Sequence, residues 1–114
     1  MTMRRFILEM GAGNDLHGGD YTKAALRAVQ DALHHSSLSF ISSLGRQASE
    51  LDVRVTIGVQ QPNAVDTDLV AASLPRGRAT VRAVKGGLDI DDESGADPAV
   101  IASAAIEVWL DVAE

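Results

Sequence analysis

The amino-acid sequence predicts an α+β domain with the order β-α-β-α-β-β, in which two helices cover one face of a four-stranded mixed sheet. Several segments alternate between apolar and polar residues, which is typical of strands with one buried face. Two segments between them have helical spacing and follow an aspartate, a residue that often caps helices. The chain has 114 residues and no long polar linker, so residues 1–114 are interpreted as a single domain.

The first strand is expected over residues 5–10. Phe6, Leu8 and Met10 would lie on one face of it, and the residues between them on the other. Four glycines within residues 11–19 predict a loop after this strand.

The first helix is expected to begin after Asp20 and to run from Tyr21 to about His35. One side of it carries small apolar residues suited to close packing on a sheet. These are Ala24, Ala25, Ala28, Val29 and Ala32. Residues 38–44 are compatible with a short helical turn that Gly45 ends.

The clearest strand covers residues 53–60, where β-branched residues alternate with polar residues or glycine. Its apolar face consists of Val53, Val55, Ile57 and Val59. Asp66 is then expected to cap a short helix that ends near Leu74, before Pro75.

Two further strands complete the predicted sheet. Residues 77–85 alternate and end at Gly86 and Gly87, and an acidic loop over residues 89–97 follows. The last strand has one apolar face, formed by Ile106, Val108, Leu110 and Val112. Residues 98–105 are compatible with a helix as well as with a strand.

Composition excludes several classes of protein. The formal net charge is −6, which argues against nucleic acid and against an anionic membrane surface as partners. The chain has no cysteine, so disulfides, thiol catalysis and thiolate metal sites are excluded. Its longest apolar runs are too short for a signal peptide or a bilayer span, so a cytoplasmic location is expected.

The sheet face without helices is expected to carry charged, hydroxyl and aromatic side chains: Arg54, Thr56, Arg82, Glu107, Trp109 and Asp111. Such a face meets water or another subunit, and a domain this small gains burial by self-association, so we expect a homo-oligomer. Arg54 and Arg82 are candidate ligand-binding residues that would hold a carboxylate or phosphate at a subunit seam. The alternative is that they pair with Glu107 and Asp111 across the sheet.

The glycine-rich segment before the first helix is the candidate functional site. Free N–H groups and the helix dipole favour an anion there, so Gly11, Gly13 and Gly18 are predicted to contact a ligand. The spacing does not fit a dinucleotide fingerprint, because Leu16 stands where a third glycine is needed. It does not fit a P-loop either, because Gly18 is followed by glycine rather than lysine.

Asp15 and His17 are the candidate catalytic residues, with His17 as acid or base and Asp15 fixing its tautomer. The pair would also serve as two ligands of a divalent metal, completed by Glu9 or Asp20. The structural alternatives are an Asx-type turn or cap for Asp15 and a backbone hydrogen bond for His17.

The remaining polar groups have simpler interpretations. His34 and His35 end the first helix, where an imidazolium interacts favourably with the helix dipole, and His35 is the better site candidate of the two. The acidic residues of segment 89–97 lack the spacing of a calcium loop and are interpreted as solvated.

The segment Gly11 to Gly18, with the pattern G-x-G-x-D-x-H-G, resembles the signature of a conserved hypothetical family of bacteria and plants, the "Lin" hypothetical family. Residues 20–35, 86–88 and 106–108 are similar to that family too, so the resemblance covers nearly the whole chain. It implies a shared loop at Gly11, Gly13, Asp15, His17 and Gly18, but no particular activity or cofactor.

The order of elements also resembles the chorismate-mutase-like fold, which includes a reactive-intermediate deaminase family and the repeat unit of cyanuric acid hydrolase and barbiturase. That resemblance implies a trimer with sites between subunits. It does not imply their chemistry, because the Ser/Lys pairing of the ring-opening amidases has no counterpart at Ser73 or Lys85.

Two functions are therefore predicted. The first is an oligomeric hydrolase or isomerase that acts on a small anionic or heterocyclic metabolite at the glycine-rich loop. The second is a non-catalytic module for metabolite binding or assembly, with or without a divalent metal at Asp15 and His17.

Overall fold

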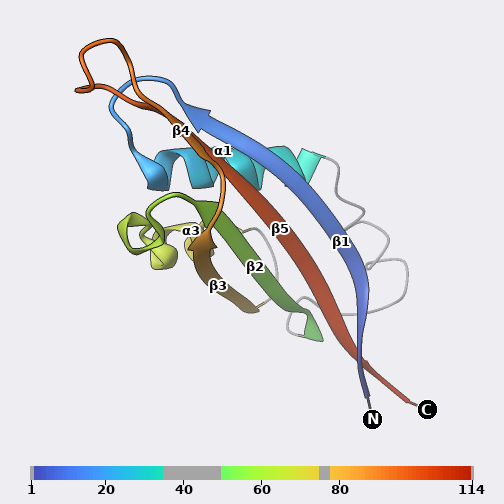
Figure 1. Cartoon of the computed structure of the whole chain (residues 1–114). Helices are drawn as coiled ribbons and strands as arrows, with labels where there is room; N and C mark the ends of the chain where they lie inside the picture. Colours follow the sequence, from blue (N-terminus) through green and yellow to red (C-terminus); the bar gives the residue numbers. More distant parts are fainter. Residues whose placement is uncertain (1, 35–49, 75–77, 114) are drawn as a thin grey trace.

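The computed structural model describes residues 2–34, 50–74 and 78–113. This part of the chain forms one mixed sheet of five strands and two α-helices (Figure 1). The strands are β1 (Thr2–Asp15), β2 (Asp52–Val59), β3 (Arg78–Lys85), β4 (Leu88–Ile90) and β5 (Ala99–Val112). The helices are α1 (Tyr21–His34) and α3 (Thr67–Ala72), and a short 3-10 helix, η2 (Pro62–Ala64), precedes α3.

The strand order in the sheet is β1-β5-β2-β3, and β4 pairs with β5 beside this path. β1 and β5 are antiparallel along their whole length, from Thr2 opposite Val112 to Asp15 opposite Val100. In Figure 1 they form a long curved ribbon at whose lower end the two termini lie together. β2 is antiparallel to β5 and parallel to β3.

The two helices and the apolar face of the sheet enclose the core. α1 packs against β1 and β5, and α3 packs against β3 and α1. The predicted apolar faces of β2 and β5 are buried there, which confirms their assignment. The opposite face of the sheet, which we call the open face, carries the polar side chains expected for it.

Gly11 and Gly13 explain how closely α1 approaches β1. A Cβ atom on Gly13 would lie 2.5 Å from the carbonyl oxygen of Ala24, and one on Gly11 would lie 2.6 Å from that of Ala28. Neither strand residue has room for a side chain, because the helix backbone occupies the space. The alanines of α1 are fully buried at this contact, as their pattern predicted.

The structure corrects two predictions for the sheet and decides between the two alternatives for residues 98–105. β1 extends to Asp15, so Gly11 and Gly13 belong to a strand rather than to a loop; glycine is common in strands where another backbone approaches closely. Residues 99–105 are part of β5 rather than a helix. Pairing with β1 and the burial of alternate side chains outweigh the weak strand propensity of this segment. Leu88–Ile90 forms a fifth strand, too short to show an alternating pattern.

The helix starts were predicted correctly. Asp20 precedes α1, and its Oδ1 accepts a hydrogen bond from the backbone N–H of Lys23 at 3.0 Å. Asp66 caps α3 through a 3.1 Å hydrogen bond from the N–H of Leu69. The expected end of α1 at His35, the turn at residues 38–44 and the stop at Pro75 lie outside the described residues.

Candidate functional site

Asp15 ends β1 and is buried, with only 4% of its surface exposed. Its Oδ2 accepts a hydrogen bond from the backbone N–H of Asp20 at 2.9 Å, and its Oδ1 lies 3.5 Å from Nη1 of Arg27. The same Nη1 donates to the carbonyl oxygen of Asn14 at 2.7 Å. Asp15 thus fastens the end of β1 to the start of α1 and to its second turn.

Four backbone amides at or near the start of α1 are bonded to groups of the chain itself. The N–H of Asp20 donates to Asp15, that of Lys23 to the Asp20 side chain, and that of Ala24 to the Asp20 carbonyl oxygen. The N–H of Gly18 donates to Oδ1 of Asp97. Carboxylates of the chain therefore accept from three of the amides near this helix start, and their negative charge disfavours the anion that was predicted to bind there.

The predicted ligand-binding glycines are placed differently from one another. Gly11 and Gly13 lie beneath α1, so the prediction that they face a ligand was wrong; their role is close packing. Gly18 lies in the loop with a φ angle of 99°, in the region that favours glycine. In this conformation its N–H donates to Asp97, in the acidic loop between β4 and β5.

His17 has a different carboxylate partner from the one predicted. Its Nδ1 lies 3.0 Å from Oδ2 of Asp97, whereas Asp15 is bonded to Asp20 and Arg27. The Gly18 amide and the His17 side chain hold the pKa of Asp97 below its ordinary value. The prediction that Asp15 orients His17 is corrected, because the buried Asp15 carboxylate is turned toward α1 while the imidazole is on the surface.

A hollow of about 210 Å³ lies beside the His17–Asp97 pair. It is lined by two loops that are far apart in sequence, through Leu16, His17, Ile90, Asp91, Asp92, Asp97 and Ala99. A hydrogen bond from the Ser94 hydroxyl and nearby backbone N–H groups lower the pKa of Asp92, so it is ionised near neutral pH. The hollow is therefore negatively charged, which disfavours anionic ligands.

The residues that the structure describes do not provide a metal centre. Within them, no three His, Asp or Glu side chains are grouped so that they could hold a metal ion. The metal site considered for Asp15 and His17 with Glu9 or Asp20 is not formed, since Asp15 is bonded elsewhere.

Buried Tyr21 and half-buried Asp89 form a pair that no local sequence pattern indicates. The Tyr21 hydroxyl, in the first turn of α1, donates a hydrogen bond to Oδ2 of Asp89 on β4. This bond, with burial, raises the pKa of Tyr21 to about 12. The pair ties the start of α1 to the strand that leads into the acidic loop, and so holds together the two loops that line the His17 hollow.

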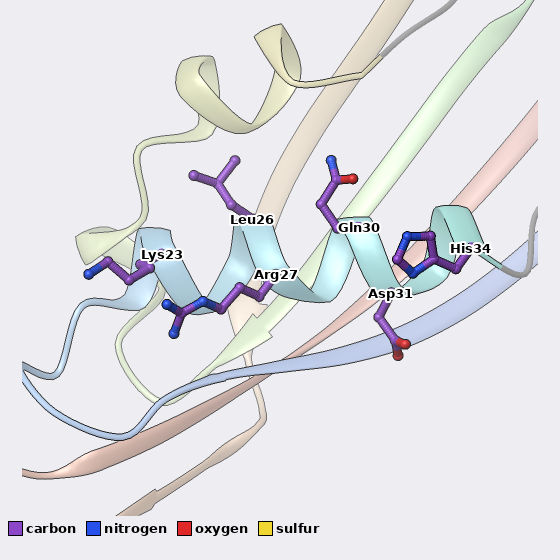
Figure 2. Close-up of a pocket in the computed structure, with 6 residues that line it drawn as sticks. All are labelled: Lys23, Leu26, Arg27, Gln30, Asp31 and His34. Atoms are coloured by element: carbon purple, nitrogen blue, oxygen red, sulfur yellow. The ribbon is translucent and has the colours of Figure 1, made fainter.

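The outer side of α1 carries another hollow, of about 370 Å³ (Figure 2). It is lined by the polar stripe of the helix and Leu26: Lys23, Leu26, Arg27, Gln30, Asp31 and His34. Two of these side chains are bonded to the edge of β1. Asp31 Oδ2 accepts from the N–H of Ala12 at 2.9 Å, and Arg27 donates to Asn14. They satisfy backbone groups of an edge strand, which blocks pairing with another strand there. His35 lies outside the described residues.

Arg54 and Arg82 lie together on the open face, as predicted. They line a hollow of about 290 Å³ with Val55, Thr56, Thr80, Glu107 and Trp109. Glu107 binds Arg5 rather than either of these arginines, at 3.3 Å. The alternative prediction was that Arg54 and Arg82 pair with Glu107 and Asp111. Among the described residues, these pairs are not formed.

Fold and sites define a small α+β domain with a histidine–carboxylate pair at one end of the sheet and an arginine-lined hollow on its open face. The chain belongs to the Lin0512 family of conserved hypothetical proteins, whose model matches residues 5–108. Its structure is similar to that of an FtsZ-like protein of unknown function from Nostoc punctiforme, with a TM-score of 0.86 and 33% sequence identity. The likeness covers 98% of this chain and 99% of the Nostoc chain.

Comparison with curated proteins gives no match for this chain. In the described ranges, neither helix is long and apolar enough to cross a membrane.

Proposed function

We propose that this protein is a hydrolase or isomerase that acts on a small molecule by acid–base catalysis, in the hollow beside His17 and Asp97. The 3.0 Å contact between Nδ1 of His17 and Oδ2 of Asp97 carries the proposal. An ionised carboxylate only accepts hydrogen bonds, so Nδ1 carries the proton of the neutral imidazole. Nε2 is then the free base, on a side chain that is 88% exposed.

The charge of the hollow selects the substrate class. Asp91, Asp92 and Asp97 line the hollow together with His17, while Leu16 and Ile90 supply an apolar lining. This lining favours a small neutral or cationic compound, including a neutral heterocycle, and it disfavours the anionic metabolite expected from the sequence.

Replacing His17 with asparagine is expected to lower kcat/KM at least about a hundredfold, because general acid–base catalysis contributes roughly 10² to 10⁴ in rate. Asp97→Asn is expected to have a smaller effect, since it changes the tautomer but keeps the base. Turnover of a panel of neutral and cationic esters, lactams and ketones measures both variants. His34→Asn is the control, because His34 lines a different hollow.

Two results would contradict the proposal. One is equal turnover by wild type and the His17→Asn variant. The other is a panel without turnover together with NMR spectra that place the His17 proton on Nε2, where it would block the base.

A second proposed function is assembly of copies of this chain through the open face, with a trimer as the expected state. Strand register places a group of exposed apolar side chains on this face: Leu8, Met10, Val84, Leu88, Ile90 and Ile101. Met10 is 63% exposed. Exposed apolar groups clustered on one face of a small domain favour burial against another subunit.

Replacing Met10 with aspartate is expected to convert the oligomer into a monomer, because a charge would be buried at the interface. Analytical ultracentrifugation measures the change. Leu69→Asp is the matched control, since Leu69 is an exposed leucine on α3, and it should leave the oligomer intact. A wild-type protein that sediments as a monomer would refute assembly.

A further inference from the structure

We infer that the open face carries a second binding site, for a small ligand with a carboxylate or phosphate group, in the hollow lined by Arg54 and Arg82. This site is separate from the proposed proton-transfer site and takes the opposite charge. It has a volume of about 290 Å³, and its side chains come from β2, β3 and β5.

Strand register brings these side chains together. Thr56 is opposite Arg82 in the parallel pair of β2 and β3, and Arg54 is opposite Thr80. Arg54 is also opposite Glu107 in the antiparallel pair of β2 and β5. Directly opposed residues point to the same face of a sheet, so two guanidinium groups and two hydroxyls surround one hollow.

Arg54 is held in place by its neighbours. Its Nη2 and Nε lie 3.0 and 3.3 Å from Oδ2 of Asp52. Its guanidinium carbon lies 4.4 Å from the centre of the Trp109 ring, a cation–π contact. Asp52 compensates much of the positive charge of Arg54. Arg54 therefore contributes mainly a rigid part of the lining, with hydrogen-bond donors on its exposed side.

Arg82 is the arginine whose positive charge is available to a ligand. Its Nε donates to the Thr56 hydroxyl at 3.2 Å, and no carboxylate of the described residues pairs with it. The planar guanidinium has five N–H donors, so its two terminal nitrogens remain available for a bidentate bond to a carboxylate or phosphate.

The carboxylate in the hollow does not cancel this charge. Glu107 is bonded to Nη1 of Arg5 and to Nε1 of Trp109, each at 3.3 Å. Arg5 is paired to Glu107 and Arg54 to Asp52, so among the described residues no carboxylate is paired with the positive charge of Arg82, in a chain of net charge −6. A local positive charge of this kind attracts anions.

Trp109 is the only tryptophan of the chain and lines the hollow, so its fluorescence reports on binding. We would titrate the full chain with inorganic phosphate, with succinate and with chloride at matched ionic strength. The expected result is a saturable change with phosphate, succinate or both at millimolar concentrations, and none with chloride. The relative affinity for phosphate and succinate identifies the anionic group.

Arg82→Gln is expected to raise Kd about tenfold or more, because hydrogen bonds to charged groups are strong. Arg82→Lys keeps the positive charge but loses the planar guanidinium that can form two parallel hydrogen bonds, and it should give an intermediate Kd. Lys85→Gln is the matched control, since it removes one positive charge from the same strand on the opposite face, and its Kd should stay within about twofold.

Circular dichroism and thermal melting establish that each variant is folded. The site is refuted if neither phosphate nor succinate gives a saturable change. It is also refuted if the folded Arg82→Gln and Lys85→Gln variants weaken binding equally, because the effect would then come from net charge rather than from the hollow.

Discussion

Replacing Gly13 with alanine is expected to lower the free energy of unfolding by about 3 kcal/mol, the upper part of the range for added volume in a packed core. The added Cβ would lie 2.5 Å from the Ala24 carbonyl oxygen and 2.6 Å from the Arg27 carbonyl carbon. Both are backbone atoms of α1, so no side-chain rotation can relieve the contact. The helix would have to move away from β1, and its buried alanines would lose their packing.

Urea unfolding followed by Trp109 fluorescence measures this change. Ala12→Ser is the matched control, because it also adds one heavy atom to β1, but on the exposed face of the strand. It should change the free energy of unfolding by about 0.5 kcal/mol or less. Equal effects of the two variants would show that α1 does not lie against Gly13 as described.

Replacing Asp15 with alanine is expected to lower the free energy of unfolding by about 2 to 3 kcal/mol. The change would leave the Asp20 N–H without an acceptor and would remove the partner of Arg27. Arg27 is half exposed, which reduces the electrostatic part of the loss. Asp15→Asn keeps an acceptor for the Asp20 N–H and should lose less than half as much.

His17→Asn is the comparison for this prediction, measured by the same urea unfolding. His17 lies on the surface, so this change should alter stability by about 0.5 kcal/mol or less. An Asp15→Ala variant as stable as wild type would contradict the anchoring role of Asp15. A His17→Asn variant as unstable as Asp15→Ala would indicate that the histidine supports the fold rather than chemistry.

These two predictions separate roles that the sequence presents as one motif. The five signature residues between Gly11 and Gly18 lie close in sequence, yet they face two environments, α1 and the acidic loop. Gly11, Gly13 and Asp15 face α1, His17 faces the acidic loop, and the Gly18 amide is bonded to Asp97. Only His17 is exposed beside a hollow, which is why the proposed chemistry depends on it.

Local sequence patterns were sufficient to predict strands with alternating apolar and polar residues and helices that begin at a capping residue. β-branched alternation located β2, and aspartates located the starts of α1 and α3. The same alternation placed Arg54 and Arg82 on the open face, since side chains in a strand follow a period of two. These features depend on neighbouring residues alone, so one sequence is enough to predict them.

The sequence by itself determined the α+β class, the faces of the main strands and the residue types available for a site. The tertiary structure decided which residues meet. Asp97 lies 80 residues from His17 and Asp89 lies 68 from Tyr21, and no local pattern links such positions. The tertiary structure also assigned the glycines to the strand beneath α1, because a missing side chain looks the same in a turn and in a close contact until the opposing backbone is in place.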